Sequence, residues 1–233
     1  MIIKTINILI SILKSLKDAL IKIKVSSRLR KINLKRSPTE QQLEVYWKAD
    51  FAQELDLWGS KDVWIEIKYL LCAKEGKVLD ICCGTGGTIK SLECIKDIKV
   101  YGFDISNLLI EKAIKSGISS NFLKVQDAAK TDYEDNEFDY SYSIGSLEHF
   151  TVEGIDKFLS ETKRITKKTT FHQIPVVKDK NYEGWLELDQ SYYNMSEEWW
   201  LNRFKKYYNK VFVIESFWDD PISNGRWFVC EKN

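Results

Sequence analysis

Hydrophobic and polar positions alternate in blocks along the chain, and from residue 77 onward short apolar runs take turns with amphipathic stretches. Short β-rich runs between turn residues predict strands, and apolar spacings of three and four predict helices. The predicted strands are residues 77–82, 100–104, 122–125, 138–144, 169–177, 211–218 and 227–230. The predicted helices between them are residues 88–96, 106–115, 152–165 and 196–208. This alternation predicts an α/β fold with a doubly wound parallel sheet and an antiparallel C-terminal edge hairpin.

Two further helices are predicted before this sheet. Ser37, Pro38 and Glu40 form a helix start, with a capping side chain, a proline at the first helical position and an acid at the third. That helix is expected to end near Leu57, and a second one to cover residues 61–73. We therefore expect a helical cap over residues 37–75, and a main domain over residues 76–233 with an insertion at about 178–195.

Residues 1–25 have the pattern of an amphipathic helix, within a basic leader that we place at residues 1–36. The longest uncharged run, residues 5–13, is nine residues long, whereas a spanning helix needs about 20. Three interpretations stay open: a helix packed on its own domain or on a twin subunit, a helix resting on an anionic membrane surface, or a helix that docks a partner.

Charge is divided unevenly along the chain. The formal net charge is +1, but residues 1–36 hold ten Lys or Arg and one acid, whereas the remainder holds 25 bases and 33 acids. The acidic main body argues against a nucleic-acid enzyme. Five cysteines without a CxxC pair argue against a disulfide framework and a zinc site, so we expect a cytoplasmic protein with reduced thiols. The basic leader leaves a membrane-peripheral location open, and the oligomeric state is not predicted.

The most informative stretch is residues 78–87, in which a predicted strand ends in a glycine turn that opens a helix. Such a turn brings a ligand close to backbone N–H groups. Asp104, at the end of the next predicted strand, is placed to bind the two hydroxyls of a ribose. A nicotinamide dinucleotide fits less well, because Ile89 stands where a small residue is needed and Asp80 would face the pyrophosphate. These residues predict an adenosine-like ligand with a cationic amine.

On these residues the chain resembles class I S-adenosylmethionine-dependent methyltransferases, which have a Rossmann-like sheet of seven strands. Residues 80–86 match the family's D-x-G-x-G-x-G motif except at Cys82, and Asp104 matches its second motif. Asp127 matches the third motif, and residues 138–149 match the fourth. The resemblance implies that S-adenosylmethionine is the cofactor and that S-adenosylhomocysteine is its product. It also implies that the residues that bind the cofactor lie at or near the ends of the predicted strands. The implied cofactor residues are Asp80, Cys82, Cys83, Gly84, Gly86, Asp104, Ile105, Asp127, Ala128, Ser143 and Ile144.

The chain has two histidines, His149 and His172, and both follow or lie in strands that reach the acceptor side. We predict His149 as the general base of methyl transfer to oxygen, with Glu148 orienting it or binding the substrate. Residues 147–149 also resemble the end of a motif in quinone-pathway O-methyltransferases, where an earlier carboxylate helps to bind a metal. Gly145 occupies that earlier position here, so no metal is predicted.

Aromatic residues gather on both sides of the predicted cofactor core. The segment 182–193 is aromatic and acidic, and we weigh an acceptor lid there against a plain insertion. Aromatic faces mixed with carboxylates suit a sugar or another polyhydroxylated acceptor. The predicted acceptor-side residues are Tyr46, Trp58, His172, Trp185, Tyr192 and Tyr193.

The flanking segments 46–52 and 58–59 are similar to methyltransferases of bacterial surface-polysaccharide and capsule pathways. That resemblance implies O-methylation of a small acceptor, such as a sugar, a nucleotide-linked sugar or a phosphate-type group on a glycan precursor. Two alternatives stay open: an enzyme that acts at a membrane surface on a lipid or quinone, and a module that binds S-adenosylmethionine without catalysis.

Overall fold

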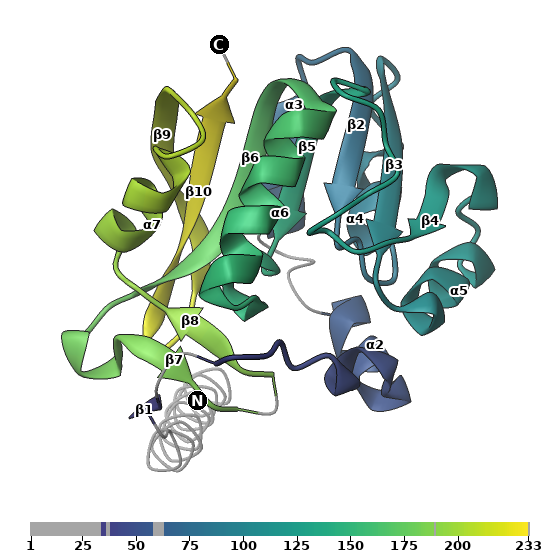
Figure 1. Cartoon of the computed structure of the whole chain (residues 1–233). Coiled ribbons are helices and arrows are strands. Elements are labelled where there is room, and N and C mark those ends of the chain that lie inside the picture. Colours follow the sequence, from purple (N-terminus) through teal and green to yellow (C-terminus); the bar gives the residue numbers. More distant parts are fainter. Residues whose placement is uncertain (1–33, 36–37, 58–62, 189, 233) are drawn as a thin grey trace, which may run out of the picture. The chain divides into compact units, whose positions relative to one another are not determined.

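The computed structural model of the chain describes residues 34–35, 38–57, 63–188 and 190–232 (Figure 1). The chain divides into two units, residues 1–34 and 35–233, of which the second carries the large sheet. The helix predicted over residues 1–25 lies outside the described residues and stays a prediction. Among the helices that are described, none combines the length and the apolar character that crossing a bilayer requires.

Seven strands form the large sheet, in the order β4-β3-β2-β5-β6-β10-β9. They span Gly76–Ile81 (β2), Ile98–Asp104 (β3), Leu123–Val125 (β4), Phe138–Ile144 (β5), Thr166–Val177 (β6), Lys210–Asp219 (β9) and Ser223–Glu231 (β10). β2 to β6 are parallel, whereas β10 runs antiparallel to both β6 and β9. The predicted Rossmann-like sheet with an antiparallel C-terminal hairpin is confirmed. Of the two hairpin strands, the last one, β10, lies next to β6, and β9 forms the edge of the sheet.

Helices cover both faces of this sheet. The helices span Ala49–Leu57 (α2), Val63–Leu71 (α3), Gly87–Leu92 (α4), Asn107–Lys115 (α5), Val152–Ile165 (α6) and Glu197–Phe204 (α7). Buried side chains of α3, α4 and α5 pack on one face, and those of α6 and α7 pack on the other. In Figure 1, α6 and α7 lie in front of the sheet and α3 lies behind it.

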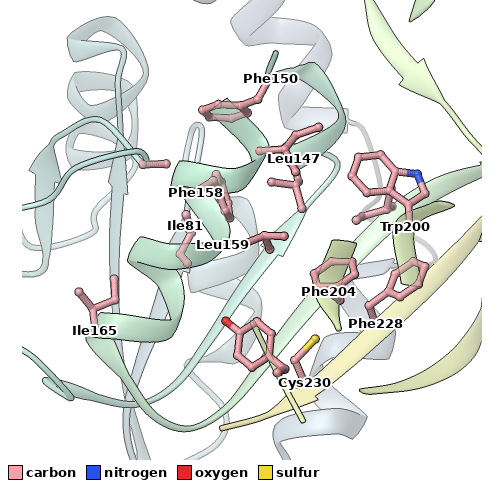
Figure 2. Close-up of a cluster of buried hydrophobic side chains, with 14 of the residues drawn as sticks. Ile81, Leu147, Phe150, Phe158, Leu159, Ile165, Trp200, Phe204, Phe228 and Cys230 are labelled. Atoms are coloured by element: carbon pink, nitrogen blue, oxygen red, sulfur yellow. The ribbon is translucent and has the colours of Figure 1, made fainter. Parts of the chain in front are cut away.

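The larger hydrophobic core lies under α6 and α7 (Figure 2). Phe158 and Leu159 of α6, Trp200 and Phe204 of α7, and Phe228 of β10 are all fully buried there. Burying one such side chain contributes about 1.5–3 kcal/mol. This core packs against β5 and β6, and the carboxyl end of β5 borders the site described next.

The segment before α2 differs from its prediction. Residues 38–43 are not helical; a short 3-10 helix, Glu44–Trp47 (η1), precedes α2. The helix predicted to start at Ser37 and Pro38 is therefore wrong over this segment. Tertiary contacts override the local capping signal there, because Gln42 and Tyr46 bond to residues far away in the sequence. The helix predicted over residues 61–73 is confirmed as α3.

The insertion contains structure that the sequence pattern did not predict. Gly184–Leu186 (β7) and Tyr192–Asn194 (β8) pair as an antiparallel hairpin apart from the large sheet. The other short elements are Leu34–Lys35 (β1) and the 3-10 helices Ser120–Phe122 (η2), Leu147–His149 (η3) and Lys180–Tyr182 (η4). The hairpin brings Ser191, just before β8, to the segment before α2, where its N–H donates to Gln42 Oε1.

A buried carboxylate joins α3 to the C-terminal hairpin. Glu66 of α3 accepts hydrogen bonds from Ser216 Oγ at 2.7 Å and from Trp227 Nε1 at 2.6 Å, and it also accepts one from the Phe217 backbone N–H. These donors satisfy a charge that would otherwise be costly to bury. One helix face is thereby fixed to β9 and β10.

Candidate functional site

A pocket opens at the carboxyl ends of β2, β3, β4 and β5, where a doubly wound sheet usually binds its ligand. Its empty space is about 880 Å³, part of which is open to solvent. The strand ends contribute Asp80, Asp104 and Asp127. The opposite wall comes from the segment before α3, which includes Tyr46, and from Gln190 of the insertion.

The turn after β2 has an unusual backbone. Cys82, Gly84 and Gly86 have φ angles of 60°, 55° and 78°, all in the left-handed region that favours glycine. The position that departs from the family motif, Cys82, thus keeps the backbone conformation that a glycine would adopt. A side chain there costs about 1–2 kcal/mol. Cys82, Cys83 and Gly84 all line the pocket, whereas Gly86 caps α4.

Gly87, the residue after this turn, leaves room for the Trp64 indole, which forms one wall of the pocket. A Cβ atom at Gly87 would lie 2.2 Å from the ring of Trp64, so only glycine lets that indole pack against the turn. Trp64 is part of α3 and lines the pocket. Sequence reasoning placed Trp58 here instead, and Trp58 lies outside the described residues.

Asp104 ends β3 and is held by the backbone on both sides. Oδ2 accepts from the Gly84 N–H and Oδ1 accepts from the Ser106 N–H, both at 2.9 Å. Burial raises the pKa of Asp104 to about 6, and these backbone donors partly oppose that rise. Each carboxylate oxygen keeps a second lone pair, so the pair can still accept from two ribose hydroxyls.

Asp80 is buried in β2, and its Oδ2 atom has no hydrogen-bond partner. Burial raises the pKa of this carboxyl well above its usual range; the neighbouring Tyr142 hydroxyl acts in the opposite direction, and the charge of Asp104 adds to the rise. This buried carboxyl has the Tyr142 hydroxyl beside it but no Lys or Arg partner among the described residues, and a buried charge without a counter-charge is costly. The pocket thus presents an acceptor that a cationic amine would satisfy.

The other predicted cofactor residues fall into two groups. Ile105, Asp127, Ala128 and Ile144 line the pocket. Ser143 is fully buried and bonds to His172 instead, so its side chain does not reach the pocket. Asp127 is exposed, and its Oδ1 accepts from the Ala129 N–H at 2.8 Å, which shapes the turn after β4.

His149 lies in η3, just after β5, and lines the pocket. Its Nδ1 atom is 2.7 Å from the carbonyl oxygen of Ser191, and because a carbonyl can only accept, Nδ1 carries the proton. Nε2 is then free to act as a proton acceptor. Burial lowers the pKa of His149 to about 4, although the Ser191 and Gly145 carbonyls favour the charged ring, so the ring is neutral at physiological pH.

Glu148 does not orient this histidine by a hydrogen bond. Glu148 Oε1 is 3.9 Å from His149 Nε2, and Oε2 has no hydrogen-bond partner. Burial raises the pKa of Glu148 to about 8, so its carboxyl is largely protonated at neutral pH. The group that fixes the ring is the Ser191 carbonyl, which sequence reasoning did not find. Backbone carbonyls leave no signature in a sequence.

The predicted acceptor-side residues separate in the structure. Tyr46 lines the pocket, and the ring of Tyr192 meets that of His149 edge-on at 6.2 Å. Trp185 and Tyr193 are buried in the larger core. His172 is 0% exposed, between Ser143 and Thr170, and is not brought to the pocket. Burial lowers its pKa to about 3.

Several pocket residues carried no sequence signal of their own. Gln41, Gln190 and Phe150 line the pocket beside Tyr46 and His149. The charged side chains of the described lining are all acidic, and the described residues contain no cluster of three His, Cys, Asp or Glu placed for a metal ion. The lining therefore combines a carboxylate-rich cofactor side with a side of amides, a phenol and an imidazole.

Comparison with known proteins gives this pocket a context. Residues 78–169 match the model of a methyltransferase domain family. Phosphoethanolamine N-methyltransferase 3 of Arabidopsis thaliana is 35% identical over 95 residues, which are 39% of this chain and 19% of that protein. The chain thus spans about a fifth of the length of that curated relative.

Two solved structures show the same fold. A SAM-dependent methyltransferase of Thermotoga maritima superposes with a TM-score of 0.64 at 19% identity, over 82% of this chain and 100% of that one. An N-methyltransferase of Haemonchus contortus, solved with phosphomonomethylethanolamine and S-adenosylhomocysteine, superposes with a TM-score of 0.61 at 18% identity. That alignment covers 78% of this chain and 56% of the other. The unpartnered Asp80 and the backbone-held Asp104 fit the amine and ribose of that cofactor.

Proposed function

We propose that the chain transfers the methyl group of S-adenosylmethionine to the oxygen of a small polar acceptor. The Rossmann-like sheet supports this proposal, and so does the match of residues 78–169 to a methyltransferase domain. The observation that carries this proposal is the position of His149. A neutral histidine with Nδ1–H fixed by a carbonyl lines the same pocket as Asp80 and Asp104. Its Nε2 atom is the proton acceptor that a hydroxyl substrate needs.

The residues divide the work of the reaction. Bound S-adenosylmethionine supplies an activated methyl group. Asp80 and Asp104 hold its amine and ribose and so fix where the methyl group lies, and most of the rate then comes from alignment. His149 Nε2 accepts the proton of the acceptor hydroxyl as the new carbon–oxygen bond forms. The electron pair of the broken carbon–sulfur bond stays on sulfur, which gives S-adenosylhomocysteine.

A second candidate is transfer to the nitrogen of an amine. The charged side chains among the described lining residues are all carboxylates, which attract a cation. One relative, that of Arabidopsis thaliana, is an N-methyltransferase, whereas two others, of Gibberella zeae, are sterol 24-C-methyltransferases. The same arrangement disfavours a phosphate-type acceptor, because no Lys or Arg is found among the lining residues that the structure describes. The destination in a surface polysaccharide has no support from these relatives, and the lipid or quinone alternative depends on residues 1–25.

The test has two stages. Calorimetry with S-adenosylmethionine and S-adenosylhomocysteine measures cofactor binding by the full chain, and a folded protein that binds neither ligand contradicts the proposal. Cofactor with a labelled methyl group is then incubated with matched acceptors that carry a hydroxyl, an amine or a phosphorylated hydroxyl. Label in the hydroxyl compounds supports the first candidate and label in the amines supports the second. Cofactor binding without transfer to any acceptor would favour a non-catalytic module.

A further inference from the structure

Two segments far apart in the sequence meet over the pocket. One is the segment 41–47 before α2, and the other consists of residues 190 and 191, just before β8. In Figure 1 the first runs along the lower edge of the sheet, from beneath β7 and β8 to α2. Gln41 and Tyr46 of the first and Gln190 of the second line the pocket, and Tyr46 hydrogen-bonds to the Gln190 side chain.

The first segment is anchored beside the ribose-binding carboxylate. Ser106 Oγ donates to the Tyr46 carbonyl at 2.7 Å, and Trp47 Nε1 donates to Asn107 Oδ1 at 3.1 Å. Ser106 is also the residue whose N–H is held by Asp104. The position of this segment is thus tied to the end of β3.

In the second segment, Ser191 makes the contacts that lead to His149. Its side chain closes the loop on itself, since Ser191 Oγ bonds to both the N–H and the carbonyl of Leu188 at 3.2 Å. Its backbone N–H donates to Gln42 Oε1 at 3.3 Å, and its carbonyl accepts from His149 Nδ1 at 2.7 Å. One peptide residue therefore connects the first segment to the histidine.

We propose that Gln42 is a positioning residue, which holds Ser191 so that its carbonyl keeps His149 in the Nδ1–H tautomer. The two segments act together: while Gln42 holds Ser191, the base is in the form that accepts a proton at Nε2. When they separate, the ring loses the acceptor that selects this tautomer. The inference rests on the proposed role of His149 in methyl transfer.

Among the groups around His149, the Ser191 carbonyl makes the contact that fixes which ring nitrogen carries the proton. Glu148, from the same 3-10 turn, is at 3.9 Å and largely protonated at neutral pH, and Tyr192 of β8 meets the ring only by its edge. Neither group sets which nitrogen carries the proton. The Gly145 carbonyl also faces the ring and favours its charged form, but the short contact, at 2.7 Å to Nδ1, is the one made by the Ser191 carbonyl. Gln42 is exposed, so its replacement removes a hydrogen bond and leaves the core untouched.

The test reads the tautomer directly by NMR of the full chain with 15N-labelled histidine, bound to S-adenosylhomocysteine. The chain has two histidines, so the spectrum is simple, and His172 serves as the internal reference. We expect His149 to be Nδ1–H in the native chain. Gln42→Ala should lower the ratio of Nδ1–H to Nε2–H by about three- to tenfold, the worth of one hydrogen bond, and leave His172 unchanged. With an active acceptor, kcat should fall by a similar factor and KM for S-adenosylmethionine should stay within about twofold.

Two variants complete the test. Gln42→Glu keeps an oxygen acceptor for the Ser191 N–H and should restore the native tautomer ratio. Glu44→Ala removes another exposed side chain of the same segment, outside the pocket lining, and should leave the ratio native. A native His149 in the Nε2–H form, or a Gln42→Ala spectrum identical to the native one, overturns the inference. An equal effect of Glu44→Ala overturns it too. These spectra need no acceptor, so a chain that transfers no methyl group refutes the proposed function but still decides this point.

Discussion

The two sides of the pocket are built in different ways. On the cofactor side, the predicted binding residues Asp80, Asp104 and Asp127 lie within two residues of a strand's carboxyl end, so the parallel sheet brings them together. On the acceptor side, residues 42, 149 and 191 come from three separate segments, and their contacts depend on loops. Gln42 and Ser191 are separated by 149 positions in the sequence.

Because of this difference, we expect cofactor affinity and reaction rate to depend on different residues. The cofactor side rests on backbone hydrogen bonds within the sheet, which are costly to break and hard to shift. The acceptor side rests on one side chain and two peptide groups in loops, which can move without unfolding the core. A residue of the first side should therefore change cofactor affinity, and a residue of the second should change the rate.

The largest effect is expected at His149. His149→Ala should lower kcat by about 10² to 10⁴-fold, because the general base is lost, with the affinity for S-adenosylmethionine within about threefold of native. Steady-state kinetics and calorimetry measure the two quantities. Glu148→Gln is the matched control: the Glu148 side chain is already largely a neutral carboxyl at pH 7, so kcat should change little. A loss of cofactor affinity in His149→Ala equal to the loss of rate would erase the distinction between the two sides.

The next effect is expected on the opposite side of the pocket. Asp104→Asn replaces one acceptor oxygen by an amide that faces the Gly84 or Ser106 N–H, and it removes the charge that the ribose hydroxyls would meet. Affinity for S-adenosylhomocysteine should fall by roughly 10²-fold, from the loss of charge-assisted hydrogen bonds. Asp127→Asn, at an exposed position, should cost less. If the two variants lose the same affinity for S-adenosylhomocysteine, the Asp104 carboxylate has no special role in binding.

A smaller effect is expected from pH. The pKa of Asp104 is about 6, and only its ionised form accepts from both ribose hydroxyls. Its ionised fraction falls about tenfold between pH 7 and pH 5, so affinity for S-adenosylmethionine should fall by a similar factor as pH falls. The raised pKa of Asp80 acts in the same direction. Calorimetry across this range should show the step in the native chain and a weaker one in Asp104→Asn; affinity that is flat or rises toward pH 5 argues against this assignment.

The smallest effect is expected in stability, at the turn itself. Cys82→Gly and Cys82→Ala lose the same thiol, but only glycine is at ease at a φ of 60°. After the greater flexibility of glycine in the unfolded chain is allowed for, Cys82→Gly should be more stable than Cys82→Ala by about 0.5–1 kcal/mol. Urea unfolding measures the difference. An alanine variant as stable as the glycine one would mean that the turn carries no strain in solution.

The same division explains what the sequence could predict. The strand ends and the glycine turn are short-range patterns, so Asp80, Asp104 and the doubly wound sheet could be predicted from the order of residues alone. Residues 38–43 carry a helix-start signal, yet contacts of Gln42 and Tyr46 hold the segment out of the helix. Such contacts depend on the assembled fold.

Single residues show the same limit on the acceptor side. His172 is predicted from the sequence as an acceptor residue because its strand reaches the acceptor side, but its side chain points into the core. Trp64 and Gln190 matched no motif, although both line the pocket. The facing direction of a side chain in a buried strand depends on register and packing, which no local pattern encodes.

The Glu66 carboxylate has a consequence for the order in which the molecule can be completed. Its donors, Ser216 and Trp227, follow it by 150 and 161 positions, so α3 cannot reach its final place until these residues have been synthesised. Trp64, two residues before Glu66, forms a wall of the pocket. A nascent chain can therefore carry the whole glycine turn on the ribosome and still lack a finished pocket. Because long-range contacts form late, we expect S-adenosylmethionine to stabilise a chain truncated before β10 less than the full chain.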